Sequence, residues 1–230
     1  MRQEWKTILN NDQMKAIYQV LLEQNAEKDL HGDESGKYLI TTIYLCTWKS
    51  PNYRGKIRLR MYQKTSKEKS YFIENKYKNA DGKFKKRLEL TSNLFNKFVE
   101  AEDGEMLITL RSFLSRIFPL DNCIQFIPIK KRIILTYIRE AYILKINNNE
   151  IRITIDSDLE TILPDGRAVR VNSLDKEERL LEIKGADISS FFEMRQIAPL
   201  NLKEKAIKFS KYKKAKKTYA TREVNAKRNN

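Results

Sequence analysis

Lys56-Ile57-Arg58-Leu59-Arg60-Met61-Tyr62 is the stretch that decides the fold. Its three cations alternate with apolar residues. Because successive side chains of a strand point to opposite faces, a strand here carries its cations on one face and its apolar side chains on the other. An ordinary half-buried strand has an apolar buried face and a solvent-exposed face of mixed polarity and charge. The stretch therefore predicts a strand whose cationic face needs an anion.

The same alternation recurs along the chain, in Glu74-Asn75-Lys76-Tyr77-Lys78, Lys85-Lys86-Arg87, Tyr137-Ile138-Arg139, Ile151-Arg152-Ile153-Thr154 and Leu181-Glu182-Ile183-Lys184. Any one such segment alone is more often a solvated sheet face. Together, with helices over their apolar sides, they predict a tunnel lined by cations. Such a lining repels itself unless anions or carboxylates lie among the cations, and Glu4, Glu74 and Glu182 supply some carboxylates.

The strand runs are not separated by crossover helices, so we expect an antiparallel sheet. The predicted fold class is α+β, an antiparallel β-barrel or tunnel with helices packed outside. Residues 1–212 are expected to form the tunnel domain and residues 213–230 a basic C-terminal tail. The predicted strands cover 2–9, 38–47, 56–63, 70–77, 83–90, 124–129, 132–146, 150–156, 168–171 and 178–184. The predicted helices cover 12–28, 93–101, 105–117, 187–197 and the chain from about 203 onward.

The composition limits the classes of function. Hydrophobic residues make up 41%, which argues against a disordered chain although 33% of residues are charged. The net charge of +15 favours a polyanionic partner without choosing among polyanions. Two cysteines, Cys46 and Cys123, and the single histidine His31 argue against a structural zinc site. No secretory signal and no apolar run of roughly 20 residues is visible, so we expect a soluble, cytoplasmic protein.

Nine segments, in order, carry a family resemblance: Arg2-Gln3-Glu4-Trp5-Lys6 (R-x-E-x-K), Tyr44-Leu45-Cys46-Thr47 (Y-F-D-T), Lys56 to Tyr62 (K-x-R-x-R-x-Y), Ile73-Glu74-Asn75-Lys76 (L-E-x-K), Lys85-Lys86-Arg87 (K-x-R), Tyr137-Ile138-Arg139 (Y-x-R), Arg152-Ile153-Thr154-Ile155-Asp156 (R-I-T-F-D), Leu181-Glu182-Ile183-Lys184 (L-E-x-K) and Phe209-Ser210-Lys211-Tyr212 (F-S-K-Y). In this order they resemble the vacuolar transporter chaperone (VTC) domain, a relative of the CYTH-type triphosphate tunnel enzymes. The resemblance spans residues 2 to 212, nearly the whole chain.

The resemblance implies a tunnel that binds triphosphate and polyphosphate. It also implies a polyphosphate polymerase, which transfers the γ-phosphoryl group of ATP to a growing phosphate chain with Mn²⁺ or Mg²⁺. By motif position, the implied catalytic residues are Lys6, Arg58, Arg60 and Lys211. The implied phosphate-binding residues are Lys56, Lys76, Lys85, Arg87, Tyr137, Arg139, Arg152, Lys184 and Ser210, and the metal ligands are Glu182 and Glu4. The alternative for Glu4 is an ion pair with a neighbouring Lys or Arg without metal binding. Phosphoryl transfer needs positioned cations and in-line alignment rather than a protein nucleophile, which suits this residue set.

Departures from the family pattern keep other functions open. Arg2 replaces the first glutamate of the CYTH opening, which argues for the VTC branch and against a CYTH-type triphosphatase. Cys46 stands where the family has Asp, and we expect it to be a packed, inert thiol. A tunnel-type triphosphatase and a non-catalytic polyphosphate- or nucleotide-binding module are the alternatives. The expected partners are ATP and inorganic polyphosphate, with no specific nucleic acid. Peripheral association with a membrane partner and the oligomeric state are left open.

Overall fold

The computed structural model of the chain describes residues 3–29, 32–115, 124–146, 148–171 and 174–228. One ten-stranded sheet runs through it in the hydrogen-bonded order β1-β10-β8-β7-β3-β4-β5-β6, while β2 pairs with β7 and β9 pairs with β8. Every described pairing is antiparallel, so the predicted α+β class with an antiparallel sheet is confirmed.

The strands are β1 (Gln3–Leu9), β2 (Glu27–Lys28), β3 (Lys37–Lys49), β4 (Arg54–Gln63), β5 (Lys69–Lys78), β6 (Lys83–Leu90), β7 (Gln125–Ile146), β8 (Asn149–Ile162), β9 (Ala168–Arg170) and β10 (Arg179–Gly185). The α-helices are α1 (Asn11–Glu23), α2 (Ser92–Glu100), α3 (Asp103–Ser115), α4 (Ser189–Phe192) and α5 (Lys211–Arg228). Two short 3₁₀ helices, η1 (Ala198–Leu200) and η2 (Leu202–Lys205), precede α5. No helix within these described ranges is long and apolar enough to cross a membrane.

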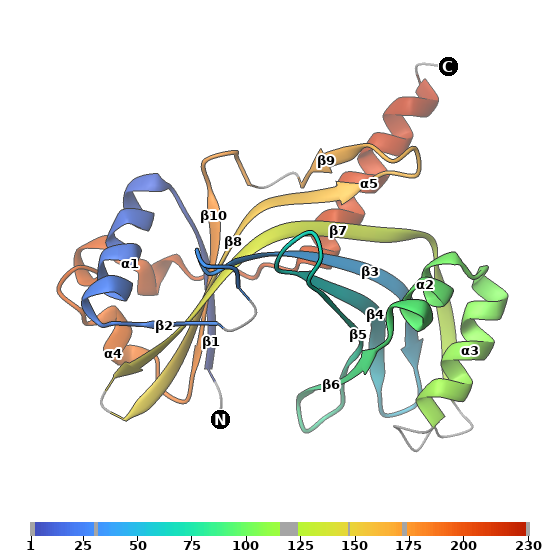
Figure 1. Cartoon of the computed structure of the whole chain (residues 1–230), viewed down its shortest axis with the longest axis horizontal. Coiled ribbons are helices and arrows are strands. Elements are labelled where there is room, and N and C mark those ends of the chain that lie inside the picture. Colours follow the sequence, from blue (N-terminus) through green and yellow to red (C-terminus); the bar gives the residue numbers. More distant parts are fainter. Residues whose placement is uncertain (1–2, 30–31, 116–123, 147, 172–173, 229–230) are drawn as a thin grey trace.

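The sheet curves but does not close into a barrel. Figure 1 shows β3, β7 and β8 running as an arch, with α1 and α4 near one end and α2 and α3 near the other. Strands β1 and β6 lie at opposite ends of the pairing order, and in the described part of the chain no strand pair joins them. Closure requires hydrogen-bonded partners on both edges. The expected tunnel wall is therefore an open, curved sheet with β6 as an exposed edge strand.

Helices cover one face of the sheet, which we call the outer face. At one end, Ile17 of α1 and Phe191 of α4 are fully buried against Ile153 of β8. At the other end, Ile57 and Leu59 of β4 are buried in a second core beneath α2 and α3. The apolar half of the alternating stretch thus packs against helices, as the sequence predicts. A capping box at Asn10 begins α1 and helps to place it.

The opposite face, which we call the inner face, carries Arg58, Arg60 and Arg139. Helix α5 packs there instead of outside, because Ala215 and the preceding Phe209 join a core with sheet residues such as Tyr44. The ring centroids of Tyr44 and Tyr212 lie 4.7 Å apart. The first turns of the predicted basic tail are therefore helical and partly buried. The division of the chain into domains at residue 212 stays a prediction.

Several predicted elements differ from those observed. The two strands predicted over 124–129 and 132–146 form the single strand β7. Strand β8 continues six residues beyond the predicted end at 156. The register with β7 shifts between Thr136 and Ile138, and Asp158 adopts a left-handed conformation (φ 49°), so a bulge lets the pairing continue past this point. The helix predicted over 187–197 is only the single turn α4 followed by turns.

The helix predicted from about 203 begins at Lys211, after η2 and an extended segment. Arg2, His31, Cys123 and the last two residues of the helix predicted over 105–117 lie outside the described residues.

Candidate functional site

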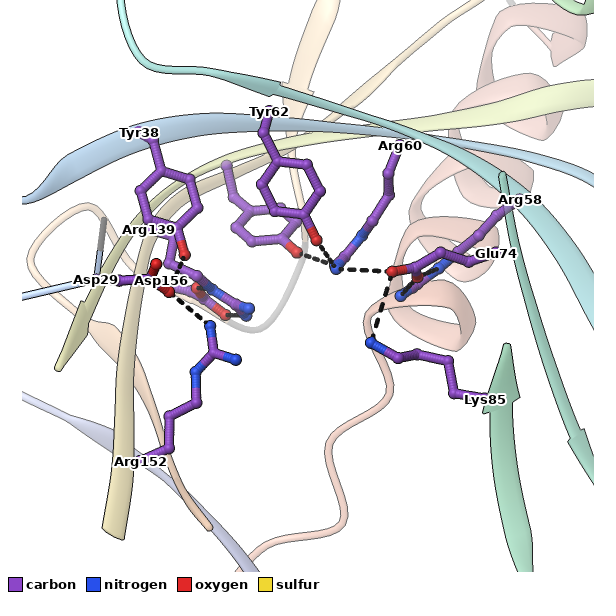
Figure 2. Close-up of polar contacts among 11 residues, drawn as sticks. Asp29, Tyr38, Arg58, Arg60, Tyr62, Glu74, Lys85, Arg139, Arg152 and Asp156 are labelled. Carbon is purple, nitrogen blue, oxygen red and sulfur yellow. Dashed lines mark hydrogen bonds and ion pairs between the residues drawn. The ribbon is translucent and has the colours of Figure 1, made fainter. Parts of the chain in front are cut away.

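Four charged side chains from three neighbouring strands meet at the Glu74 cluster, which consists of Arg58, Arg60, Glu74 and Lys85. Arg58 Nη2 lies 2.5 Å and Arg58 Nε 2.9 Å from Glu74 Oε2. Arg60 Nη1 and Lys85 Nζ each lie 3.8 Å from Glu74 Oε1. Figure 2 shows all four side chains converging. The strand register causes this, because Glu74 pairs with Arg58 on β4 and with Arg87, two residues from Lys85, on β6.

Glu74 is fully buried, and this makes its charge state important. Burial alone would raise the pKa of its carboxyl group, but the charges of Arg58, Arg60 and Lys85 outweigh burial and lower the pKa to about 2. Glu74 therefore stays ionised near neutral pH. Three cations face this one carboxylate, so the cluster keeps a positive excess.

Tyr137 lies next to the Glu74 cluster on β7. Arg60 Nη2 donates to Tyr137 Oη at 2.5 Å, and Arg60 Nη1 donates to Tyr62 Oη at 2.8 Å. Burial acts to raise the pKa of Tyr137, yet the charges of Arg60, Arg139 and Lys211 lower it. The phenol oxygen thus holds one guanidinium in place inside a strongly positive field.

A second buried carboxylate organises the Asp156 cluster, which consists of Arg139, Asp156 and Lys211. Arg139 donates to both carboxylate oxygens, with Nε 2.6 Å from Oδ1 and Nη2 2.8 Å from Oδ2. Lys211 Nζ, at the start of α5, lies 2.6 Å from Asp156 Oδ2 and 4.9 Å from the centre of the Tyr137 ring. Burial would raise the pKa of Asp156, but Arg139 and Lys211 lower it. The first residue of α5 is thereby held on the inner face.

Glu4, Lys6, Glu182 and Lys184 form the Glu182 cluster on the adjacent strands β1 and β10. Lys6 Nζ lies 2.5 Å from Glu4 and 3.7 Å from Glu182, and Lys184 pairs with both carboxylates. Burial acts to lower the pKa of Lys6, but Glu182 and Glu4 raise it overall. Burial likewise acts to raise the pKa of Glu182, and Lys211, Lys184 and Lys6 lower it overall. The field of Lys211 therefore reaches this cluster as well as Asp156.

On the inner face, Arg152 pairs with Asp29, a residue that the sequence did not single out. Its Nη2 donates to Asp29 Oδ2 at 2.8 Å, and Tyr38 Oη contacts the same oxygen at 3.4 Å. Figure 2 shows Arg152 and Arg139 pointing toward each other from β8 and β7. Asp29 follows the two-residue strand β2, which pairs with β7 and so brings this loop to the site.

The other predicted phosphate-binding residues lie around these clusters. Lys56 Nζ lies 3.8 Å from the centre of the Tyr212 ring, and the Arg87 guanidinium lies 4.4 Å from that of Phe72. Ser210 precedes α5, and its hydroxyl accepts a hydrogen bond from the backbone N–H of Lys213 at 3.4 Å. Ser210 is therefore the N-cap of α5 in this structure.

Lys76 is exposed to solvent on the inner face of β5. Its pKa is lowered to about 6, first by the charge of Arg58 and then by desolvation and Arg60. A lowered pKa in a solvent-exposed lysine indicates that positive charge around it is already dense. An arriving anion would raise this pKa again.

Within the described residues, no three His, Cys, Asp or Glu side chains come together as a group that could hold a metal ion. The closest arrangement is the pair Glu4 and Glu182, which share Lys6 and Lys184 as partners. Mg²⁺ is commonly held by one or two carboxylates together with substrate phosphates, and these two residues fit that donor chemistry. Cys46 is fully buried in the core beneath α2 and α3, away from this pair.

The sequence did not indicate Asp29, and it gave Tyr62 and Asp156 only as motif positions without a role. Asp156 carried a signal, because it shares the face of Arg152 and Thr154 in an alternating segment. No sequence pattern marked Asp29, because its position beside Arg152 depends on the pairing of β2 with β7. Most predicted site residues lie on one face of the sheet in the three clusters, which Tyr137 and Lys211 link. Outside the clusters lie Lys56, Lys76, Arg87, Arg152 and Ser210. Their roles in binding and catalysis stay predictions.

Comparisons with known proteins give one family match. A family model described as the VTC domain matches residues 1–219. No curated protein matches the chain. One solved structure, described as a putative adenylyl cyclase from Hippeastrum with a dominant triphosphatase activity, is similar at 11% identity and a TM-score of 0.44, covering 89% of this chain and 88% of that one. A similarity this low carries no argument about the chemistry of this chain.

Proposed function

This chain belongs to the VTC domain family, and on that basis we propose that it is a metal-dependent polyphosphate polymerase that uses ATP. The observation that carries the proposal is the gathering of cations from seven elements on one face of the sheet. They are Lys6, Arg58, Arg60, Lys76, Lys85, Arg139, Arg152 and Lys211. The carboxylates among them leave a positive excess that a chain of phosphates would neutralise.

The residue types support phosphate as the ligand. Arginine presents a planar fork of donors that matches phosphate oxygens, while lysine acts as a mobile point charge. The Nε atoms of Arg60 and Arg152 make no hydrogen bond within the part of the chain that the structure describes. Both Nε atoms are also buried, so a ligand could bind them only after the side chains move.

In the proposed reaction, a terminal oxygen of the acceptor phosphate chain attacks the γ-phosphorus of ATP. The bond from that phosphorus to the β–γ bridging oxygen breaks, and ADP leaves. Because the attacking phosphate oxygen is already ionised, the step needs no protein nucleophile or base. Arg58 and Arg60 bind oxygens of the transferred group, and Lys6 and Lys211 neutralise charge on the phosphates beside it.

Glu182 and Glu4 are the residues that would hold Mn²⁺ or Mg²⁺, because the pKa of Glu182 is lowered and its carboxylate stays ionised. A divalent cation held by these carboxylates would neutralise part of the charge of the bound phosphates. The lysine partners keep both carboxylates turned toward the inner face.

A non-catalytic polyphosphate-binding module is the second candidate. One observation favours it: Glu182 contacts Lys6 through one oxygen and Lys184 through the other. A metal ion must compete with both lysines for this carboxylate. If it cannot, phosphate chains would bind without turnover.

An assay that follows polymer, ADP and orthophosphate together separates these functions. Purified protein is incubated with ATP and Mn²⁺ or Mg²⁺, beside Arg60→Gln, Glu182→Ala and the control Lys145→Gln, whose ammonium pairs with Glu27 on the surface. We expect polymer from the wild type and the control, and a rate lower by roughly a hundredfold or more in Arg60→Gln. Orthophosphate without polymer would instead identify a triphosphatase, and tight polyphosphate binding without turnover would identify a binding module.

A further inference from the structure

Four cations stand in one row across the end of the sheet, where β3, β4, β5 and β6 meet their turns. Lys49 pairs with Arg54, Arg54 pairs with Lys78, and Lys78 pairs with Lys83. We call these four residues the rim ladder. Directly paired residues of adjacent strands point to the same face, and Arg54 lies at even spacing from Arg58, so the row lies on the inner face.

The rim ladder is unusual because like charges stand side by side. Neighbouring strands are only about 5 Å apart, and like charges directly opposite one another destabilise a sheet. All four side chains are exposed, and none forms an ion pair with a carboxylate among the residues that the structure describes. Among the described residues, no carboxylate therefore offsets the repulsion within this row.

A cavity of about 470 Å³ lies at this row. Lys49, Arg54 and Lys78 line it together with both adjacent turns, including Tyr53 and Asn79. The β3–β4 turn and the β5–β6 turn form its walls. Three of the four rim-ladder residues, Lys49, Arg54 and Lys78, thus line an open depression.

A second row of cations connects the rim ladder to the proposed active centre. Lys56 pairs with Lys76, and Lys76 pairs with Lys85 of the Glu74 cluster. Desolvation by partial burial lowers the pKa of Lys56, and the charges of Lys213 and Lys216 on α5 lower it further. Helix α5 therefore adds positive charge beside this row. From Arg58 to Arg54 the strand rises by about 13 Å, and cations occupy every inner-face position on the way.

We propose that the rim ladder binds the phosphate chain where it leaves the proposed active centre, so that the polymer extends along β4 and β5 toward the β3–β4 and β5–β6 turns. The inference rests on the proposed function and adds the direction in which the chain runs. The ligand is a linear inorganic polyphosphate, because the rows form one continuous track from the buried arginines. Binding of a nucleic acid or a membrane surface to exposed cations does not require the rows of cations to continue to the buried arginines.

The test compares two probes on two matched double variants. Lys78→Gln/Lys83→Gln removes two charges from the rim ladder, and Lys67→Gln/Lys69→Gln removes two from exposed positions around the opposite end of β5. Binding of inorganic tripolyphosphate and of long-chain polyphosphate is measured over a range of salt concentrations. We expect the rim variant to bind the long chain roughly tenfold or more weakly, with a smaller salt dependence, and to bind tripolyphosphate as the wild type does. The control variant should bind both probes like the wild type.

Other outcomes overturn the inference. Equal affinity of the rim variant and the wild type for the long chain would do so while leaving the proposed function intact. A parallel loss of tripolyphosphate binding would show a general effect rather than a track. Wild-type protein that binds neither probe would reject the proposed function and this inference together. Single-stranded DNA that binds as tightly as long-chain polyphosphate, and depends equally on Lys78 and Lys83, would show that the row does not select phosphate chains.

Discussion

Glu74→Gln removes the only carboxylate that holds Arg58, Arg60 and Lys85 together in the described structure. The ordinary pKa of the group is 4.5, and in the folded chain it is lowered to about 2. A difference of that size corresponds to about 3.4 kcal/mol, because each pKa unit is worth about 1.36 kcal/mol. The side chain is fully buried, so solvent screening does not reduce this value. We expect the variant to lose about 3 kcal/mol of unfolding free energy near pH 7.

The sign of the pH dependence follows from the lowered pKa. The stabilisation from ionised Glu74 is complete above about pH 4.5 and is lost as the pH falls toward about 2. The difference between wild type and variant should therefore shrink from about 3.4 kcal/mol near pH 7 to about 2 kcal/mol near pH 3.5. Urea unfolding at both pH values measures it, and Glu89→Gln, an exposed change on β6, should stay within about 0.5 kcal/mol of the wild type. A Glu74→Gln loss below about 1 kcal/mol near pH 7, or one independent of pH, would show that the charge of Glu74 does not stabilise the fold through these three cations.

Three further predictions follow from particular side chains. Because the pKa of Lys76 is about 6 in the free protein, binding of polyphosphate near pH 7.5 should take up protons. Calorimetry in two buffers of different ionisation enthalpy measures this uptake, which should be smaller in Lys76→Gln. Burial raises the pKa of Cys46 to about 12, so a thiol reagent should label it only after unfolding, which peptide mapping by mass spectrometry would check. In Gly55→Ala the added Cβ would overlap the Trp48 indole, so urea unfolding should show a loss of about 2 kcal/mol, whereas Gly104→Ala, which meets open space, should show none.

The strands and their two faces were predictable because the signal is local. Alternation in the stretch from Lys56 to Tyr62 correctly placed Ile57 and Leu59 under helices and Arg58 and Arg60 on the inner face. Helix ends and strand ends were less predictable. The turn after α4 and the continuation of β8 past residue 156 depend on packing and on a bulge rather than on periodicity.

The site was predictable as a set of cations but not as an arrangement. The family resemblance implied that Arg139 binds phosphate and that Lys211 is catalytic. Asp156 was quoted only as part of a motif, yet it is the group that joins them. The packing of α5 on the inner face differs from the expected position of the helices outside the sheet, although the resemblance implied that Ser210 and Lys211 lie at the phosphate site. It follows from the burial of Phe209 and Ala215, which periodicity in a strongly basic helix does not indicate.

Side-chain alternation along each strand is a property of covalent geometry, so the amino-acid order alone determined that charged and apolar residues would separate onto two faces. Which carboxylate meets which cation, and the separation of β1 and β6 at the two edges of the sheet, depend on how distant segments pack together. Those outcomes depend on register and sheet curvature between segments as distant as Lys6 and Glu182, and no local pattern encodes such distances.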